Sequence, residues 1–155
     1  MIVYRLARKK YMHDLSGKGA EFGGGRWNTK GKAMLYTSGS QALCLVEVLV
    51  HLQNDMIPKD YFIVEIDIPD KLKVKTISQK NLVENWKDFP WQNQTQYIGD
   101  DFLNEQKFLI LKVPSAIVED EFNFLINPHH PDFSKIKIVT SHYFSFDNRL
   151  FINKH

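Results

Sequence analysis

The chain has 155 residues, of which 43% are hydrophobic and 25% charged, and its formal net charge is +2. This length and composition predict one globular domain over residues 1–155, large enough to bury a core. The basic residues are scattered rather than clustered, which argues against a nucleic-acid-binding surface and agrees with a small anionic ligand.

The sequence shows no recognisable targeting signal and no cysteine motif. Cys44 is the single cysteine, so an internal disulfide and a CxxC metal or redox motif are excluded. Met1–Leu6 is too short an apolar run for a signal peptide, and no segment reaches the length of a membrane span. We therefore expect a cytoplasmic protein without membrane contact.

The first part of the chain predicts a short strand followed by a loop. Residues 2–6 predict the strand. Arg5 within it could face the cleft or solvent, and we expect solvent. The polar, glycine-rich segment Lys9–Gly25 predicts the loop. It contains Gly17-Lys18-Gly19, but no strand–GxGxxG–helix arrangement follows, so a Rossmann or P-loop phosphate site is not supported.

A β-hairpin is predicted next. Residues 26–28 and 33–37 predict its two strands, with Gly31 supplying the flexible turn. Such a hairpin would bring Arg26 and Tyr36 to neighbouring strands. The glycines that precede it would let a ligand approach the backbone closely.

An almost wholly apolar helix follows the hairpin. Ser38 and Gln41 have the spacing of a capping box, and we expect the helix to run from Ser38 to Leu52. Because the segment is apolar on nearly every side, we expect it at the centre of the fold, covered by other elements.

Glu47 is the only acid in this helix. Burial of an unpaired carboxylate is costly, and Arg26 is the nearest strong candidate to meet it. His51 stands one turn later, where it could pair with Glu47 or interact with the helix dipole. The alternative is that Glu47 lies on a narrow solvated stripe of the helix.

The rest of the chain predicts further strands and one more helix. The strands are predicted at Tyr61–Ile68, Leu72–Ile77, Phe108–Val113, Phe122–Ile126, Ile136–Val139 and Tyr143–Phe146, and the helix at Thr95–Asn104 after a long polar loop over residues 81–94. We expect an α+β domain with a mixed, mostly antiparallel sheet. Ser115 follows a strand end, where side chains reach a cleft, although a serine after a proline is usually a turn residue. His129 and His130 have no third ligand at metal spacing nearby, so no metal site is predicted.

Seven segments that span nearly the full length carry a family resemblance. They are DLSGKGAEFGGGRWN (Asp14–Asn28), LYTS (Leu35–Ser38), ALCLVEVLVHL (Ala42–Leu52), IGD (Ile98–Asp100), VPSAIV (Val113–Val118), NFLINPHHPDF (Asn123–Phe133) and FDNRL (Phe146–Leu150). With them the sequence resembles the RES-domain family, which is named for an arginine, a glutamate and a serine. The family's arginine falls on Arg26, its tyrosine on Tyr36, its glutamate on Glu47 and its serine on Ser115.

The resemblance implies the toxin of a bacterial toxin–antitoxin pair, with a fold similar to that of ADP-ribosyltransferases. It implies NAD as the substrate. The acceptor would be water, inorganic phosphate or a protein, so the activity is NAD hydrolysis, NAD phosphorolysis or ADP-ribosyl transfer. The implied partner is an antitoxin with a helix-turn-helix domain, in a hetero-oligomer.

Side-chain chemistry agrees with these expectations. Arg26 can hold phosphate oxygens in a bidentate fork, and Tyr36 offers a flat face for a nicotinamide ring. Glu47 can stabilise the positive charge that develops on ribose, while Ser115 could bind the ribose or guide the nucleophile. The residues expected to bind NAD are Gly25, Arg26, Trp27, Asn28 and Tyr36.

Two alternatives stand beside the enzyme. Arg26 and Glu47 could form a salt bridge that only braces the core. The protein could also be a non-enzymatic inhibitor or a nucleic-acid-binding module, but the clustered basic face that would mark such a module is not seen in the sequence.

Overall fold

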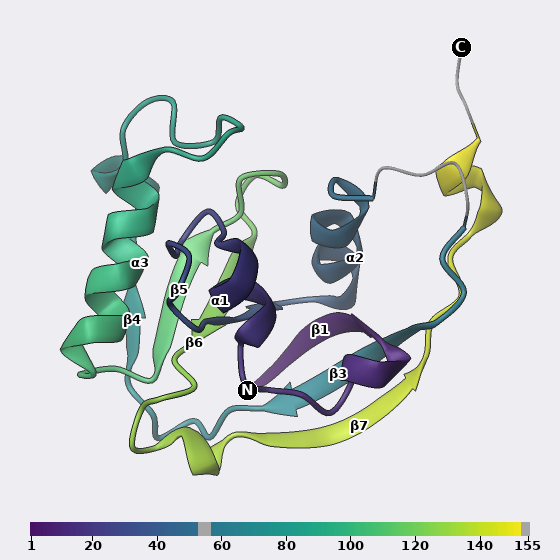
Figure 1. The fold of residues 1–155 in the computed structure, drawn as a ribbon, viewed down its shortest axis with the longest axis horizontal. Coiled ribbons are helices and arrows are strands. Elements are labelled where there is room, and N and C mark those ends of the chain that lie inside the picture. Colours follow the sequence, from purple (N-terminus) through teal and green to yellow (C-terminus); the bar gives the residue numbers. More distant parts are fainter. Residues whose placement is uncertain (53–56, 153–155) are drawn as a thin grey trace.

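The computed structural model describes residues 1–52 and 57–152. Within them, one mixed sheet has the strand order β4-β5-β6-β2-β1-β3-β7 (Figure 1). The strands are β1 Ile2–Arg8, β2 Leu35–Ser38, β3 Tyr61–Asp67, β4 Val74–Thr76, β5 Ile110–Pro114, β6 Phe122–Ile126 and β7 Lys137–Tyr143. All neighbouring pairs are antiparallel except β4 and β5. The predicted α+β class with a mostly antiparallel sheet is confirmed.

Helices and short 3₁₀ turns connect the strands. The helices are α1 Lys18–Gly23, α2 Gln41–Leu49 and α3 Asn93–Glu105, and the 3₁₀ turns are η1 Lys9–Tyr11, η2 Gln79–Asn81, η3 Phe133–Lys135 and η4 Asn148–Phe151. None of the helices in the described residues is long and apolar enough to cross a bilayer.

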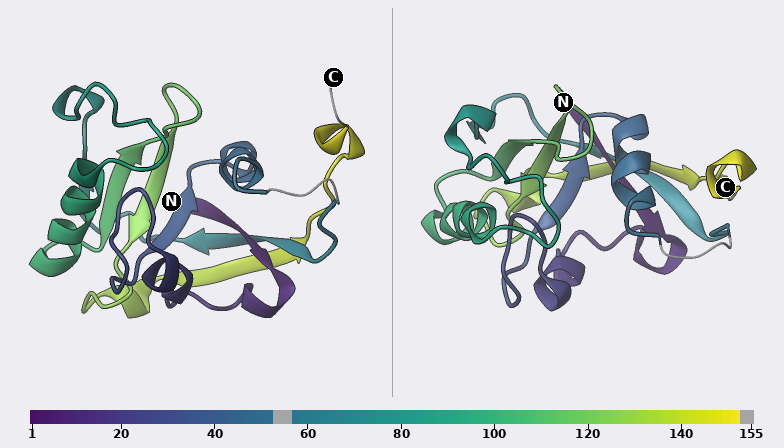
Figure 2. Two further views of the ribbon diagram at one scale, coloured as in Figure 1. Left: turned by 45° about the horizontal axis from the view of Figure 1, so that its top comes forward. Right: turned by 90° about the horizontal axis from the view of Figure 1, so that it is seen from above.

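The sheet opens between β1 and β2. These strands share a single residue pair, Tyr4 with Ser38, whereas β1 and β3 are paired along the whole length of β1. Helix α2 packs on both β1 and β2 beside this opening (Figure 1). Helix α3 lies near β4 and β5, at one end of the sheet (Figures 1 and 2). The separation leaves room for a cavity between the two halves of the sheet.

Three apolar clusters hold these layers together. One joins both halves of the sheet and contains Val3 and Ile126, and a second packs Phe102 of α3 against Leu111 of β5. The third lies under α2, where Cys44 meets the aromatic residues near the C-terminal end of the described chain. The strands on each side of the opening are therefore stabilised by an apolar cluster of their own.

The hairpin predicted over residues 26–37 is wrong. An isolated bridge between Gly25 and Asn28 closes a tight turn instead, and β2 pairs with β1 and β6. The physical reason is the burial of Trp27, which packs against Trp86 with ring centroids 6.2 Å apart. The segment predicted as a loop before this turn also contains η1 and α1.

Helix α2 begins later and is less covered than predicted. Its N-cap is Ser40, whose side chain accepts the N–H of Leu43 at 3.1 Å, while Ser38 stays in β2. The helix ends at Leu49. Only Leu43 and Cys44 are buried, because α2 packs with one face on the sheet and leaves another facing the cavity.

The later elements agree with the sequence patterns. The predictions at residues 61–68, 72–77, 95–104, 108–113, 122–126 and 136–139 are confirmed within a few residues. A separate strand at residues 143–146 is not formed, because β7 continues to Tyr143 and ends there.

Candidate active site

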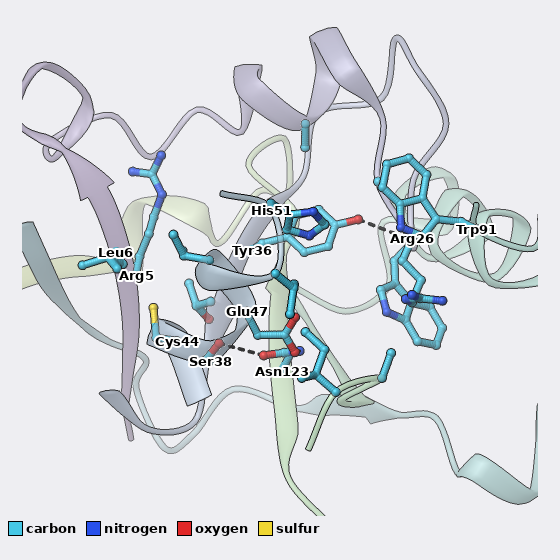
Figure 3. Close-up of a pocket in the computed structure, with 18 of the residues that line it drawn as sticks. Arg5, Leu6, Arg26, Tyr36, Ser38, Cys44, Glu47, His51, Trp91 and Asn123 are labelled. Carbon is cyan, nitrogen blue, oxygen red and sulfur yellow. Dashed lines mark hydrogen bonds between the residues drawn. The ribbon is translucent and has the colours of Figure 1, made fainter. Parts of the chain in front are cut away.

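A cavity of about 840 Å³ lies where β1 and β2 separate, alongside α2 (Figure 3). Its lining comes from β1, α1, the turn before β2, β2 itself, α2, the loop before α3, the end of β5 and the start of β6. Arg26, Tyr36 and Glu47 all contribute to it. The structure therefore brings three of the four predicted site residues to one cavity, and the fourth, Ser115, contacts Glu47 from behind.

Two hydrogen bonds set the orientation of the Glu47 carboxylate. Ser115 Oγ donates to Oε1 at 2.8 Å, and Asn123 Nδ2 donates to the same oxygen at 2.6 Å. Within the described residues, Oε2 accepts no hydrogen bond. One carboxylate oxygen is thus used to fix the group, and the other is available to a ligand in the cavity.

Ser115 is engaged on every side. Besides its donation to Glu47, its Oγ accepts the N–H groups of Ile117 and Val118, each at 3.1 Å. The residue is 3% exposed and does not line the cavity. Protein groups therefore occupy the donor and both acceptor positions of the Ser115 hydroxyl, an arrangement that suits a side chain that orients Glu47.

Asn123 is the site residue that the sequence did not single out. It lies on β6, where its Oδ1 accepts the hydroxyl of Ser38 at 2.7 Å while its Nδ2 donates to Glu47 (Figure 3). The available signal was an amide in an otherwise apolar strand, FNFLI, which resembles the isolated acid in the apolar helix. The network runs from β2 through β6 to α2.

Arg26 contacts backbone rather than Glu47. Its guanidinium donates to the carbonyl oxygens of Trp86, Lys87 and Asp88 at 2.5, 3.2 and 3.1 Å. No ion pair joins Arg26 to Glu47 among the described residues, so the alternative of a salt bridge that only braces the core is not formed. Burial lowers the pKa of Arg26, and the charge of Glu47 opposes that shift, so the two groups interact through space.

Tyr36 is fixed through its hydroxyl. Its Oη accepts the N–H of Trp27 at 3.0 Å and donates to Asn28 Oδ1 at 2.7 Å, and burial raises the pKa of the phenol. A Cβ at Gly25 would lie 2.6 Å from this oxygen, so only glycine fits there. Tyr36, Trp27 and Gly25 line the cavity.

Asn28 does not fit its predicted role as an NAD-binding residue. It is 0% exposed, and its Nδ2 donates to the carbonyl oxygens of Ala20 and Lys32 at 2.8 and 2.9 Å. Its Oδ1 accepts from Tyr36, so the amide holds the turn and the tyrosine together. We correct its assignment to a structural support of the site.

The cavity is predominantly basic. Arg26, Lys87, His51 and Arg5 line it, and Glu47 is the only carboxylate in the lining that the structure describes. Arg5 was expected in solvent, but its Nη1 donates to the carbonyl oxygens of Tyr11 and Asp14 at 3.1 and 2.8 Å, and burial lowers its pKa. A basic cavity with one oriented carboxylate suits an anionic ligand that develops positive charge during reaction.

Metal ligation finds no support in the described residues. Among them no three histidine, cysteine, aspartate or glutamate side chains gather where they could hold an ion. His130 Nδ1 instead accepts the N–H of Asp132 at 3.1 Å.

Comparison with known proteins assigns the chain to a family. The model of the RES domain matches residues 2–147. The chain belongs to the RES-domain family. The Prs ADP-ribosylating toxin of Sphingobium sp. (strain YBL2) is 37% identical over 146 residues, which cover 93% of this chain and 91% of that protein. Toxin Res of Yersinia enterocolitica is 35% identical over 152 residues, covering 97% and 99%.

A solved structure shares the RES-domain fold of this chain. In the M. tuberculosis MbcT–MbcA toxin–antitoxin complex, a chain with 21% sequence identity superposes with a TM-score of 0.78, covering 97% of this chain and 86% of that one. The relatives carry toxin names, and the shared fold agrees with the assignment of this chain to the RES-domain family.

Proposed function

We propose that this RES-domain toxin binds NAD in the cavity and breaks the bond between nicotinamide and ribose. The observation that carries the proposal is the Glu47 carboxylate, with one oxygen held by Ser115 and Asn123 and the other open to a basic cavity. The name of the Sphingobium relative supports it, because ADP-ribosylation consumes NAD at this same bond.

Glu47 has the central role in the proposed chemistry. Cleavage of the nicotinamide–ribose bond develops oxocarbenium character on the ribose. A carboxylate that is already oriented stabilises this charge without reorganising during the reaction. Nicotinamide leaves as a neutral molecule, so the cavity needs no strong general acid.

Arg26 and Lys87 provide the positive charge for the diphosphate. A guanidinium carries five N–H donors, and three of those of Arg26 are used by backbone carbonyls. The two other N–H groups are available to phosphate oxygens. Arg26 can therefore form fewer hydrogen bonds to a diphosphate than a free guanidinium could. Tyr36, whose hydroxyl is already bonded, can present only its ring to nicotinamide.

The acceptor of the ADP-ribosyl group is proposed to be water or inorganic phosphate. No second carboxylate lines the described cavity to activate water, whereas phosphate is ionised near neutral pH and needs no base. The competing proposal is transfer to a protein, which the name of the Sphingobium relative favours. In either case the activity is expected in the cytoplasm, where the bacterial NAD pool lies.

The deciding experiment is to incubate the purified protein with NAD and identify the products by mass. It should be run in phosphate and in a non-nucleophilic buffer of equal ionic strength. A phosphorylated ADP-ribose indicates phosphorolysis, and free ADP-ribose in both buffers indicates hydrolysis. Nicotinamide release only when a bacterial extract is added, with mass gain on a protein, indicates transfer. If none of these conditions releases nicotinamide, the proposal is wrong.

Glu47→Gln is the variant that tests the mechanism. The amide keeps the size of the side chain but removes the charge, so NAD cleavage should fall by about a hundredfold or more while the protein still folds. Glu119→Gln, at an exposed position outside the cavity, is the matched control. Near wild-type turnover in Glu47→Gln would make Glu47 structural.

We further propose a cognate antitoxin, with a helix-turn-helix domain, that covers this cavity in a hetero-oligomer. Val50 and Ile117 line the cavity and are 55% and 38% exposed, so apolar surface surrounds its opening. Such surface is typical of a protein-binding site. A purified complex with the antitoxin should release no nicotinamide from NAD, and full activity in the complex would contradict this.

A further inference from the structure

Two aromatic side chains form a corner at the cavity. Phe89 and Trp91 lie in the loop before α3, with ring centroids 5.5 Å apart and planes at 88° to each other. Both line the cavity, and Phe89 is 71% exposed. Exposed aromatic rings that face a cavity are the usual platform on which a heterocyclic base stacks.

The backbone that carries this corner is anchored. Arg26 donates to three successive carbonyl oxygens, from Trp86 to Asp88, immediately before Phe89. Trp86 is 2% exposed and packs against Trp27. Hydrogen bonds from Arg26 fix the backbone of this loop, and the packing of Trp86 on Trp27 fixes its start. The two rings of the corner therefore follow a segment of fixed position.

The proposed ribose, phosphate and base contacts follow one another along the cavity. Glu47 is the carboxylate for the ribose, and Arg26 provides the N–H groups for phosphates. Arg26 also holds the loop of Phe89 and Trp91, so the corner adjoins the phosphate end. Figure 3 shows Arg26 and Trp91 on one side of Glu47, with Arg5 and Cys44 on the other. A dinucleotide presents ribose, diphosphate and base in this same order.

We infer that the Phe89–Trp91 corner is a base-binding subsite for the adenine of NAD. The inference rests on the proposed function and deepens it. A flat purine can stack on one ring while its edge meets the face of the other, because the two planes are almost perpendicular. When the ribose of an extended dinucleotide lies at Glu47 and its diphosphate at Arg26, the adenine end reaches this corner and the nicotinamide lies away from it.

The test measures equilibrium binding of two probes that the protein does not cleave at a nicotinamide bond. ADP-ribose carries the adenine and the diphosphate, and pyrophosphate carries the diphosphate without a base. Isothermal titration should be run on wild type, Trp91→Ala, Phe89→Ala and Phe22→Ala. Phe22 is 89% exposed on α1 and does not line the cavity, so its variant is the matched control.

The expected result is specific to the base. Trp91→Ala and Phe89→Ala should each raise the Kd for ADP-ribose by roughly tenfold, as when a base loses one aromatic stacking partner. Their Kd for pyrophosphate should not change, and Phe22→Ala should bind both probes like wild type. Because Phe89 is mostly in solvent, its variant keeps the test valid even if Trp91→Ala unfolds.

Two outcomes overturn the subsite. One is an unchanged Kd for ADP-ribose in both loop variants, or no ADP-ribose binding by wild type. The other is equal weakening of both probes, which would mean that the loop supports the phosphate site alone. Failure of the proposed function has a different signature, because ADP-ribose would bind with the expected variant pattern while NAD is not cleaved.

Discussion

At the scale of single residues, the site depends on which donor and acceptor atoms already form hydrogen bonds within the protein. Both hydrogen bonds to Glu47 end on the same oxygen, and the hydroxyls of Ser115 and Tyr36 are saturated by protein groups. Of the four predicted site residues, this leaves the Oε2 atom of Glu47 and two N–H groups of Arg26 for a ligand, beside the Lys87 and His51 side chains that also line the cavity. The number of polar groups that can contact NAD is therefore smaller than the number of polar side chains near the cavity.

Ser115→Ala should lower kcat for NAD cleavage by roughly tenfold or more and leave KM almost unchanged. One charge-assisted hydrogen bond to Glu47 is lost, but no cavity surface is removed. Steady-state kinetics gives this split, and Ser115→Thr, which keeps the hydroxyl, should restore most of kcat. A rise in KM without a fall in kcat would show that the serine contacts the substrate.

Arg26→Lys should raise KM for NAD at least about tenfold, because an ammonium cannot hold three carbonyls and a phosphate together. Amide hydrogen exchange over residues 82–92 should become faster in the same variant. Arg149→Lys, which changes an exposed arginine of η4, is the control. Unchanged kinetics in Arg26→Lys would remove both the phosphate role and the loop-holding role.

At the scale of elements, α3 fixes the turn that carries Arg26. A Cβ at Gly99 of α3 would lie 1.6 Å from the carbonyl oxygen of Trp27, so helix and turn touch backbone to backbone. The Asp100 carboxylate accepts hydrogen bonds from the backbone N–H and the hydroxyl of Thr29, at 3.0 and 2.6 Å. The position of Arg26 is thus set by a helix about seventy residues later in the chain.

Gly99→Ala should destabilise the protein by about 3 kcal/mol, since α3 must move away from the turn to admit the methyl group. Urea unfolding measures the change in free energy. Gly23→Ala, in α1, is the control because a Cβ there meets nothing within 4 Å. Equal stability of the two variants would mean that the close contact between α3 and the turn at Trp27 does not contribute to stability.

At the scale of the whole molecule, the cavity exists because the sheet opens between β1 and β2. Tyr36 lies on β2 at this opening, and its phenol hydroxyl is buried against the turn that carries Trp27 and Asn28. Burial raises its pKa above the ordinary value of about 10. The protonation of this one hydroxyl is therefore linked to the stability of the fold.

The stability of the wild type should fall as pH rises above about 10, by up to about 1.4 kcal/mol per pH unit from Tyr36. In that range the unfolded phenol loses its proton while the folded one keeps it, so the native state binds more protons. Tyr36→Phe should be less stable at neutral pH, through its lost hydrogen bonds, but its curve should fall less steeply above pH 10. Parallel curves for the two proteins across this range would contradict the burial of the hydroxyl.

The sequence by itself predicted most of the strands, and it named Arg26, Tyr36 and Glu47, which the structure places at one cavity. Alternating apolar residues predicted the strands from Tyr61 onward, and an isolated acid in an apolar helix pointed to Glu47. Both signals are local, since they depend on the spacing of residues within one element. The resemblance added the family, which the comparisons confirmed.

Only the tertiary structure decided how the site is assembled. The partners of Glu47 lie 68 and 76 residues away in the chain, at Ser115 and Asn123, and the carbonyls bound by Arg26 lie about sixty residues away. Spacing within an element carries no information about which distant elements meet. For that reason the hairpin, the solvent position of Arg5 and the Arg26–Glu47 pair were wrong. The hydrogen bond from Ser115 to Glu47 likewise depends on which elements lie side by side.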